Sequence, residues 1–259
     1  MKKLVIYTCV TGGYDTIEDP AAICPDADYI AFTTGSLESG VWQRRDLTYP
    51  RAGISEAGNT APTLAARWHK LHPATLFPEY EYSLWIDGNV VINGPQIYQR
   101  LEKLMSSGVK YAGIPHPFGG DAYDEAARIL HADKESFRAL SRTVRFLRKH
   151  DFPRGMPLYE TNVLLRKHSD PQVRRCDEMW WTCLSTLTKR DQMTQSYCLR
   201  ECGITPKRLL PEGRSARDDE SFKYILHGRQ WVKDLSPKGR LRDALRRVKE
   251  LTFKTFVLR

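Results

Sequence analysis

Short apolar runs alternate with longer segments of helical periodicity along most of this 259-residue chain. Runs rich in β-branched and aromatic residues predict strands, at residues 4–8, 28–33, 42–49, 82–92 (interrupted near its middle), 110–114 and 161–165. The longer segments predict helices at residues 60–72, 95–105, 122–150 (with a break inside it), 172–187 and 191–202. Strands that alternate with helices form a mostly parallel sheet with helices packed on it. The sequence therefore predicts an α/β fold, with residues 1–237 as one domain.

The last segment, residues 238–259, predicts a basic amphipathic helix. It contains eight Lys or Arg and two acids, so it supplies +6 of the formal net charge of +9. Leu241, Leu245, Val248 and Leu251 recur at the spacing of one helical face. A helix of this kind suits an anionic membrane surface. A helix docked on the body, with its basic face in solvent, is the alternative that the sequence leaves open.

Composition and charge argue against several classes of protein. The apolar run of residues 4–10 is too short for a signal peptide, and no stretch approaches the eighteen or so residues of a membrane span. Outside the tail the charge is close to neutral, so nucleic acid is not an expected partner. The six cysteines lack zinc-site spacing and predict reduced thiols. We expect a cytoplasmic protein, peripheral at the inner face of the membrane if the tail binds lipid.

An Asp-Gly-Asn step, Asp87 to Asn89, interrupts the apolar run of residues 82–92. Ligands of open α/β sheets gather beyond the carboxyl ends of the strands. Two oxygen-bearing side chains two residues apart suit a hard divalent cation that also binds a diphosphate. Asp-Gly-Asn is equally a favourable hairpin turn. Local chemistry leaves these two interpretations, metal site and hairpin, open.

Several short motifs follow one another in an order that resembles a known family. They are Tyr7-Thr8, Gly12-Gly13-Tyr14-Asp15, Phe32-Thr33, Arg67 with Lys70, Trp85-Ile86-Asp87-Gly88-Asn89, His116-Pro117, Leu158-Tyr159-Glu160-Thr161 and Arg190-Asp191-Gln192. This order resembles a glycosyltransferase-like domain family, once of unknown function, which bacterial proteins share with plant Golgi proteins linked to cell-wall polysaccharide. The resemblance covers about residues 4–200 and implies the GT-A fold, a Rossmann-like α/β arrangement.

The resemblance implies a metal-dependent glycosyltransferase, whose Asp-x-Asp motif binds Mn²⁺ or Mg²⁺ together with the diphosphate of a nucleotide-sugar. Asp87 and Asn89 stand at that motif, with Asn89 in place of the second Asp. An amide oxygen ligates a cation without adding negative charge, so we expect a weaker metal affinity. His227 distantly resembles a third metal ligand of some retaining transferases, and a simple surface histidine is the alternative.

The same resemblance assigns residues to the donor. It implies that Thr8, Tyr14 and Thr33 line the nucleotide pocket at the ends of the first two strands. Arg67 and Lys70 lie three residues apart on one helical face. They would offset the charge of the diphosphate, Arg67 as a fork and Lys70 as a point charge. A solvated helix face is the alternative for this pair.

Acceptor-side residues follow from the later motifs. The resemblance implies that Asp191 and Gln192 stand beside the anomeric carbon, whereas helix capping alone would also favour Asp191. Glu160 is expected in a loop before a strand, either as a general base that meets the acceptor hydroxyl or as a surface carboxylate. His116, Tyr123 and Glu125 are expected to bind the acceptor.

We therefore expect transfer of a sugar from a nucleoside-diphosphate sugar to a hydroxyl acceptor, in the synthesis of surface polysaccharide or another glycan. Two alternatives remain. A nucleotidyltransferase that forms nucleotide-sugars would normally carry a Gly-rich basic loop, and here no nearby Lys or Arg follows Gly12-Gly13. A non-enzymatic protein that binds membrane surfaces through its tail is the other.

Overall fold

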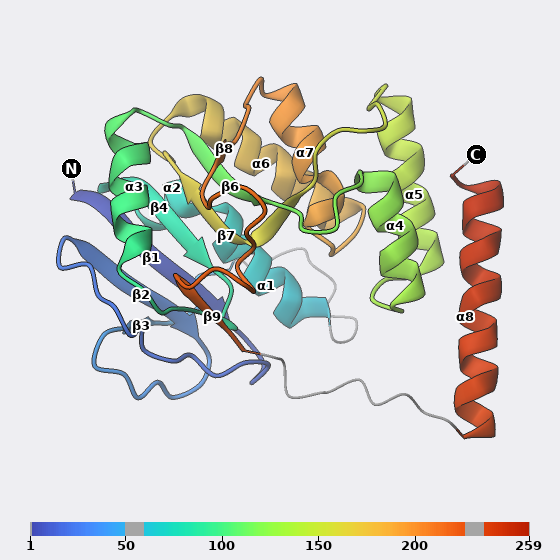
Figure 1. Ribbon diagram of the computed structural model, residues 1–259, viewed down its shortest axis with the longest axis horizontal. Coiled ribbons are helices and arrows are strands. Elements are labelled where there is room, and N and C mark those ends of the chain that lie inside the picture. Colours follow the sequence, from blue (N-terminus) through green and yellow to red (C-terminus); the bar gives the residue numbers. More distant parts are fainter. Residues whose placement is uncertain (1, 50–59, 226–235, 259) are drawn as a thin grey trace.

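The computed structural model describes residues 2–49, 60–225 and 236–258, and its core is a seven-stranded sheet (Figure 1). The strand order is β3-β2-β1-β4-β7-β6-β8. These strands are β1 (Lys2–Val10), β2 (Ala27–Thr33), β3 (Gln43–Arg45), β4 (Tyr80–Ile86), β6 (Tyr111–Pro115), β7 (Tyr159–Arg166) and β8 (Lys207–Arg208). All of the pairings are parallel except the two that β7 makes with β4 and β6. The mostly parallel sheet predicted from the sequence is confirmed.

Helices cover both faces of this sheet (Figure 1). They are α1 (Thr60–Leu71), α2 (Pro73–Leu76), α3 (Gln96–Ser106), α4 (Ala122–His131), α5 (Phe137–Lys149), α6 (Pro171–Thr186), α7 (Gln192–Glu201) and α8 (Pro237–Phe256). One core contains alternate strand residues such as Tyr7 and Trp85, packed with side chains of α4 to α7. The opposite core contains Ile6 and Leu84, packed with Ile97 of α3. This alternation explains why the central strands read as almost continuously apolar.

The break predicted inside residues 122–150 lies between α4 and α5. Asp121 caps α4, accepting hydrogen bonds from the backbone N–H groups of Tyr123 and Asp124. Ser136 caps α5 by accepting from the N–H of Ala139. Both residues satisfy N–H groups that the first turn of a helix leaves without partners. All six cysteines are free thiols, as expected.

The Asp-Gly-Asn step is a turn, but the hairpin interpretation is wrong. The N–H of Val90 donates to the carbonyl of Asp87 at 2.9 Å, so the chain does turn there. β5 (Val90–Ile92), however, pairs with β9 (Phe222–Tyr224) in a separate two-stranded sheet. β4 instead pairs with β1 and β7. The turn therefore ends a central strand at the edge of the main sheet.

The tail forms the predicted helix, α8, which packs against α4 and α5 (Figure 1). Phe253 is fully buried and meets Phe137 at 5.4 Å between ring centroids. Ion pairs join His131 to Glu250 and Arg246 to Asp133. The apolar stripe expected from the sequence faces solvent. Leu245, Val248 and Leu251 are exposed, and so is Phe256, with exposed fractions between 54% and 80%. Across the described ranges, no helix has the length and apolar character needed to cross a bilayer.

Candidate active site

The reversed direction of β7 brings the start of that strand to the edge where β4 and β6 end. Ile86 pairs with Val163, and Ile114 with Glu160. Thr161 of β7 therefore lies at the same edge as Asp87. The N-terminus of α7, capped by Asp191, and the C-terminal half of α1 reach this edge as well. The carboxyl edge of the sheet is where ligands bind in open α/β folds.

A buried cluster of charges forms the centre of this edge. Lys70 Nζ lies 2.7 Å from Asp191 Oδ2, and Arg67 lies 2.9 Å from the same oxygen. The hydroxyl of Thr161 also donates a hydrogen bond to that oxygen at 3.0 Å. The Lys70 side chain is fully buried and that of Asp191 is 4% exposed. The sequence suggested that Arg67 and Lys70 share a helical face, and the structure brings both of them to Asp191.

The electrostatics of the cluster favour the anionic form of Asp191. Burial would raise the pKa of Asp191, but the positive charges of Arg67 and Lys70 outweigh burial and hold that pKa well below its usual range. Burial lowers the pKa of Lys70 from its ordinary value, and the carboxylates of Asp191 and Asp87 oppose that effect. An Asp with so low a pKa is anionic at neutral pH, so it attracts and orients cationic or polar groups there.

Asp87 is the second acid of the cluster and its more accessible one. Its Oδ1 accepts a hydrogen bond from Trp85 Nε1 at 2.6 Å and lies 3.4 Å from Lys70 and 3.7 Å from Arg67. The Asp87 side chain is 26% exposed. Two cations thus lie between two carboxylates, and Asp87 is the carboxylate that faces outward.

A second buried network holds Lys70 in place. The Tyr7 hydroxyl donates to the carbonyl of Lys70 at 2.8 Å, and Arg166 donates to the same carbonyl at 2.6 Å. Arg166 is itself paired with Asp177 at 2.9 Å. Sequence reasoning missed Arg166, whose only signal was an arginine directly after the apolar run of residues 163–165.

The Gly12-Gly13 turn packs against the turn after β4. Both glycines have positive φ, 65° and 62°, which glycine adopts without strain. A Cβ built on Gly88 would lie 2.4 Å from Cγ2 of Val10 and 3.5 Å from Cβ of Asp15. Glycine at position 88 is therefore required for the close approach of the two turns, which brings the first motif to the Asp87 site.

The predicted nucleotide-binding residues occupy different environments. Thr8 and Thr33 are buried at the ends of β1 and β2, and Thr33 Oγ1 accepts from the N–H of Gly35 at 3.1 Å. Tyr14 is exposed, and it lies close enough to Arg67 for an electrostatic interaction between the two side chains. Tyr14 therefore belongs to the surface near Arg67, whereas both threonine side chains lie within the fold.

Glu160 does not lie in a loop, and that prediction is wrong. It belongs to β7, is buried, and pairs with Arg217. It also accepts a hydrogen bond from the N–H of Ala216 at 3.2 Å. Burial raises the pKa of Glu160, against the hydrogen bond from Ala216 and the charge of Arg217. This carboxylate fastens residues 215–217 to the sheet edge.

The three predicted acceptor-binding residues do not converge. Tyr123 is buried and its hydroxyl donates to the carbonyl of Phe152 at 2.5 Å, so it packs inside the helical layer. Glu125 is buried and pairs with Arg128 at 2.8 Å. His116 lies near this pair, since Glu125 and Arg128 both act on its pKa, which burial lowers. His116 and Glu125 thus share one neighbourhood, and Tyr123 points away from it.

The predicted metal ligands are partly described. Asn89 is buried and its amide nitrogen donates to the carbonyl of Ile225 at 3.2 Å. His227 lies outside the described residues. No group of three or more His, Cys, Asp or Glu arranged for a metal exists in the ranges that are described. Asp87 supplies one partly exposed carboxylate at this turn, and Mg²⁺ usually binds one or two carboxylates of a protein and completes its shell with phosphates and water.

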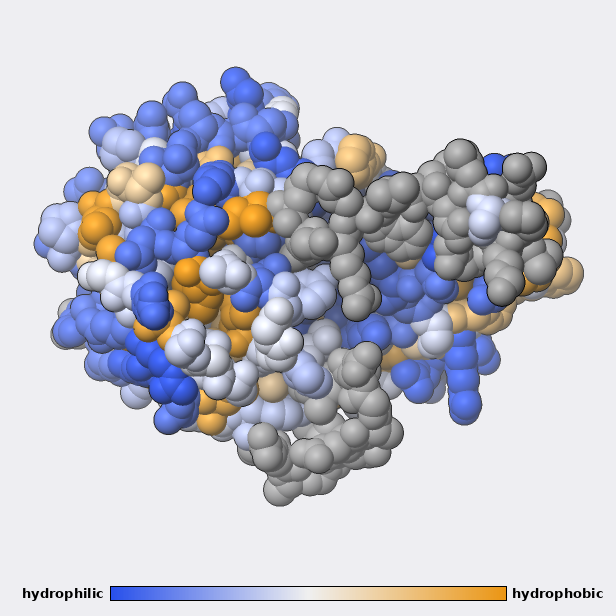
Figure 2. Space-filling view, turned by 90° about the horizontal axis from the view of Figure 1, so that it is seen from below, coloured by the Kyte–Doolittle hydropathy of each residue, from blue (hydrophilic) through white to orange (hydrophobic). Residues whose placement is uncertain are grey.

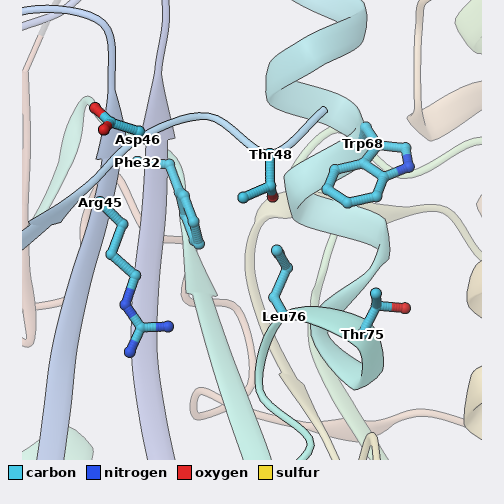
Figure 3. A pocket seen from close by; sticks show the side chains of 7 residues that line it. All are labelled: Phe32, Arg45, Asp46, Thr48, Trp68, Thr75 and Leu76. Atoms are coloured by element: carbon cyan, nitrogen blue, oxygen red, sulfur yellow. The ribbon is translucent and has the colours of Figure 1, made fainter. Parts of the chain in front are cut away.

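A pocket of about 630 Å³ lies between the β2–β3 side of the sheet and helices α1 and α2 (Figure 3). Its lining is Phe32, Arg45, Asp46, Thr48, Trp68, Thr75 and Leu76. None of the residues predicted for the site lines it. Arg45 and Asp46 are the charged residues of its lining, and none of the four charged residues of the cluster at the sheet edge contributes to it.

The cluster of acids and buried cations lies beyond the carboxyl edge of an α/β sheet, the place where open α/β folds bind their ligands. A match to the TOD1/MUCI70, glycosyltransferase-like domain spans residues 59–209. The chain belongs to this family. The matched residues include Arg67, Lys70, Asp87 and Asp191, and they exclude the Gly12-Gly13 turn.

The chain is also similar to a solved structure, the "WbbM bifunctional glycosytransferase apo structure". The two share 11% sequence identity with a TM-score of 0.40, over 75% of this chain and 37% of that chain. This chain thus spans less than half the length of that structure. No curated protein matches the sequence.

Proposed function

We propose that this protein transfers a sugar from a nucleoside-diphosphate sugar to a hydroxyl group of a glycan acceptor, in surface polysaccharide or other glycan synthesis. The observation that carries the proposal is the buried cluster of Lys70, Arg67, Asp191 and Asp87 at the carboxyl edge. It lies within the part of the chain that matches the glycosyltransferase-like family. A nucleoside diphosphate is the leaving group that such buried cations suit.

The residues at the carboxyl edge would have different roles in binding the donor. Arg67 and Lys70 offset the negative charge of the leaving diphosphate. Asp87 and Asn89 would hold a divalent cation, Mn²⁺ or Mg²⁺, which supplies Lewis-acid stabilisation of that group when bound. The exposed ring of Tyr14 contacts the nucleotide at the surface next to Arg67. Thr8 and Thr33 shape the ends of the first two strands beneath it.

On the acceptor side, Asp191 orients rather than deprotonates. Its pKa lies far below neutral, and an effective general base has a pKa near the working pH. Its carboxylate instead fixes Lys70, Arg67 and Thr161, while Gln192 follows it at the start of α7. Glu160 would have to break its ion pair with Arg217 to accept a proton. We therefore assign Glu160 a structural role, in which it holds residues 215–217 against the sheet edge.

The proposal is tested by thermal unfolding with a panel of UDP-, GDP- and CMP-sugars, each with and without Mn²⁺. A ligand that binds only the native state raises its stability by mass action. We expect one nucleoside-diphosphate sugar to raise the unfolding temperature, and to release nucleoside diphosphate on turnover. Release of pyrophosphate would identify a nucleotidyltransferase instead, and no stabilisation by any donor would contradict the proposal.

The same protein is proposed to lie at an anionic membrane surface, at the inner face of the cytoplasmic membrane. The supporting observation is the outer side of α8, where Leu245, Val248, Leu251 and Phe256 are exposed. Figure 2 shows apolar side chains at that outer, right-hand end of the molecule. Exposed basic residues alternate with them, at Arg247, Lys249 and Lys254. An exposed apolar stripe flanked by basic residues is the pattern of interfacial helices.

A further inference from the structure

A second group of basic side chains lies on the acceptor side of the candidate active site. Lys134 stands in the connection between α4 and α5, and Arg190 directly precedes Asp191. The carboxylate of Glu135 joins the two segments, accepting from the Thr188 hydroxyl at 2.9 Å and the Lys189 N–H at 3.2 Å. Lys134 and Arg190 are therefore held on adjoining segments at one end of the site.

The charges of these residues act on one another across that end. Partial burial lowers the pKa of Lys134, and the positive charge of Arg190 lowers it further, with Arg217 adding a smaller effect. Glu125 opposes them. Burial raises the pKa of Asp191, and the charges of Arg67 and Lys70 lower it. The charge of Arg190 adds a smaller lowering effect. This group therefore forms one electrostatic neighbourhood with the reacting end of the site.

The positive charge of this neighbourhood is only partly compensated. Arg128 is paired with Glu125, and Arg217 with Glu160. Lys134 and Arg190 have no ion pair within the ranges that the structure describes. The balance leaves the positive charges of Lys134 and Arg190 beside Asp191. Lys134 is exposed and Arg190 is half-buried, so both side chains can reach an anionic ligand from solvent.

Two buried hydrogen-bonding atoms of the same neighbourhood also lack partners in the described part of the chain. They are Nε of Arg190 and Nδ1 of His116. Buried polar atoms are hydrogen-bonded in the large majority of cases, so an unpartnered donor beside a site indicates a missing ligand or water. An arginine suits planar or tetrahedral oxyanions because its N–H groups form a fork.

We propose that Arg190, Lys134 and His116 form a subsite for an anionic group, a carboxylate or a phosphate, carried by the acceptor sugar. This rests on the proposed function, since it names the class of acceptor. The acceptor rather than the donor is assigned because β6, which leads into His116, lies two strands from β4, which leads into Asp87. The donor diphosphate is assigned to Arg67 and Lys70, on the Asp87 side. The subsite therefore selects acidic acceptors without competing for the diphosphate.

The test is a calorimetric titration of three probes that share one ring into the full chain, saturated with the nucleoside diphosphate that stabilises it. Glucose, glucuronate and glucose 6-phosphate differ at C6, which is neutral, a carboxylate or a phosphate. We expect one or both acidic probes to bind at least tenfold more tightly than glucose. The tighter of the two identifies the anion that the acceptor carries.

Arg190→Gln and Lys134→Gln should each weaken the acidic probe by about tenfold, the usual effect of losing one hydrogen bond to a charged group. Glucose binding should not change. Arg138→Gln, an exposed arginine of α5, removes the same charge outside the subsite and should leave all three affinities as they are. Equal binding of acidic and neutral probes, or equal losses in Arg138→Gln and Arg190→Gln, would overturn the subsite.

Failure of the subsite is distinguishable from failure of the proposed function. Binding of the nucleoside diphosphate is measured separately and should be the same in wild type, Arg190→Gln and Lys134→Gln. If no nucleotide stabilises the chain, the donor proposal fails, and the three probes are then titrated without nucleotide. Acidic-probe binding that depends on Arg190 in that experiment would still support the subsite.

Discussion

Asp87 is the residue at which the proposed donor chemistry is most directly testable. Asp87→Asn removes a full negative charge and keeps both the shape of the side chain and a residue suited to turns. The flanking strands are untouched, so the fold should survive. Because the cation would lose its only charged ligand in the Asp-Gly-Asn step, Mn²⁺-dependent donor affinity should fall by an order of magnitude or more.

Titration of donor into Asp87→Asn, first with Mn²⁺ and then with chelator, measures this effect. Asp46→Asn is a matched control, because Asp46 is exposed and pairs with Arg44 at the surface. Wild-type affinity in Asp87→Asn would argue against a metal at this position. Donor binding by the wild type that ignores chelator would argue the same.

Asp191 makes folding stability depend on pH in the acid range. Its folded pKa lies below its unfolded value, so the unfolded state binds more protons as the pH falls. The stabilisation is complete above the unfolded pKa, about 4, and is lost as the pH falls toward the folded pKa. Asp191→Asn should therefore show a shallower loss of unfolding free energy between pH 5 and pH 3 than wild type.

Urea unfolding at three pH values within that window provides the measurement. At neutral pH, Asp191→Asn should cost about 3–5 kcal/mol, because Lys70 is fully buried and loses its nearest counter-ion. Asp124→Asn is the control, since Asp124 pairs with Arg154 at the surface. Identical slopes for Asp191→Asn and wild type would show that Asp191 titrates normally in the folded protein.

At the scale of elements, the approach of the first motif to β4 depends on Gly88. Gly88→Ala places a methyl group against Val10 Cγ2, and overpacking of this kind typically costs about 1–3 kcal/mol. Val10→Ala removes the obstructing methyl groups, so the double variant should recover part of the stability lost in Gly88→Ala. Chemical denaturation of the two single variants and the double variant tests this coupling. Simple additivity of the two losses would show that the turns are not in contact.

The direction of β7 determines which of its residues reach the candidate active site. Because it runs against its neighbours, its first residues, rather than its last, lie at the carboxyl edge. Thr161 reaches Asp191 only for this reason, and Glu160 is placed against Arg217. Strand direction cannot be derived from the periodicity of a run, which is the same either way.

At the scale of the whole molecule, α8 is proposed to hold the protein against a membrane. Val248→Glu with Leu251→Glu adds charge to the exposed apolar stripe without touching Phe253, through which α8 docks. Binding to vesicles that contain anionic lipid should fall several-fold, since each change removes apolar area and adds repulsion. Co-sedimentation of the wild type and the double variant with such vesicles measures it. Undiminished binding of the double variant would contradict the proposal.

The sequence by itself determined the alternation of strands and helices, because periodicity and capping residues such as Asp121 and Ser136 act over a few neighbouring positions. It also identified the residues that meet at the edge, Arg67, Lys70, Asp87 and Asp191, through the order of their motifs. It placed the basic tail in one helix. These features depend on local chemistry, or on motifs that a chain carries wherever it folds.

Only the tertiary structure decided which of these side chains meet and which face away. Lys70 and Asp191 are 121 residues apart in the chain, and their 2.7 Å contact depends on how α1 and α7 pack across the sheet. Tyr123 points inward and donates to the carbonyl of Phe152, and Glu160 binds the N–H of Ala216. The apolar stripe of α8 is exposed. Each of these depends on long-range packing, in which the free energy of burial is shared among many side chains and no single local pattern selects the partner.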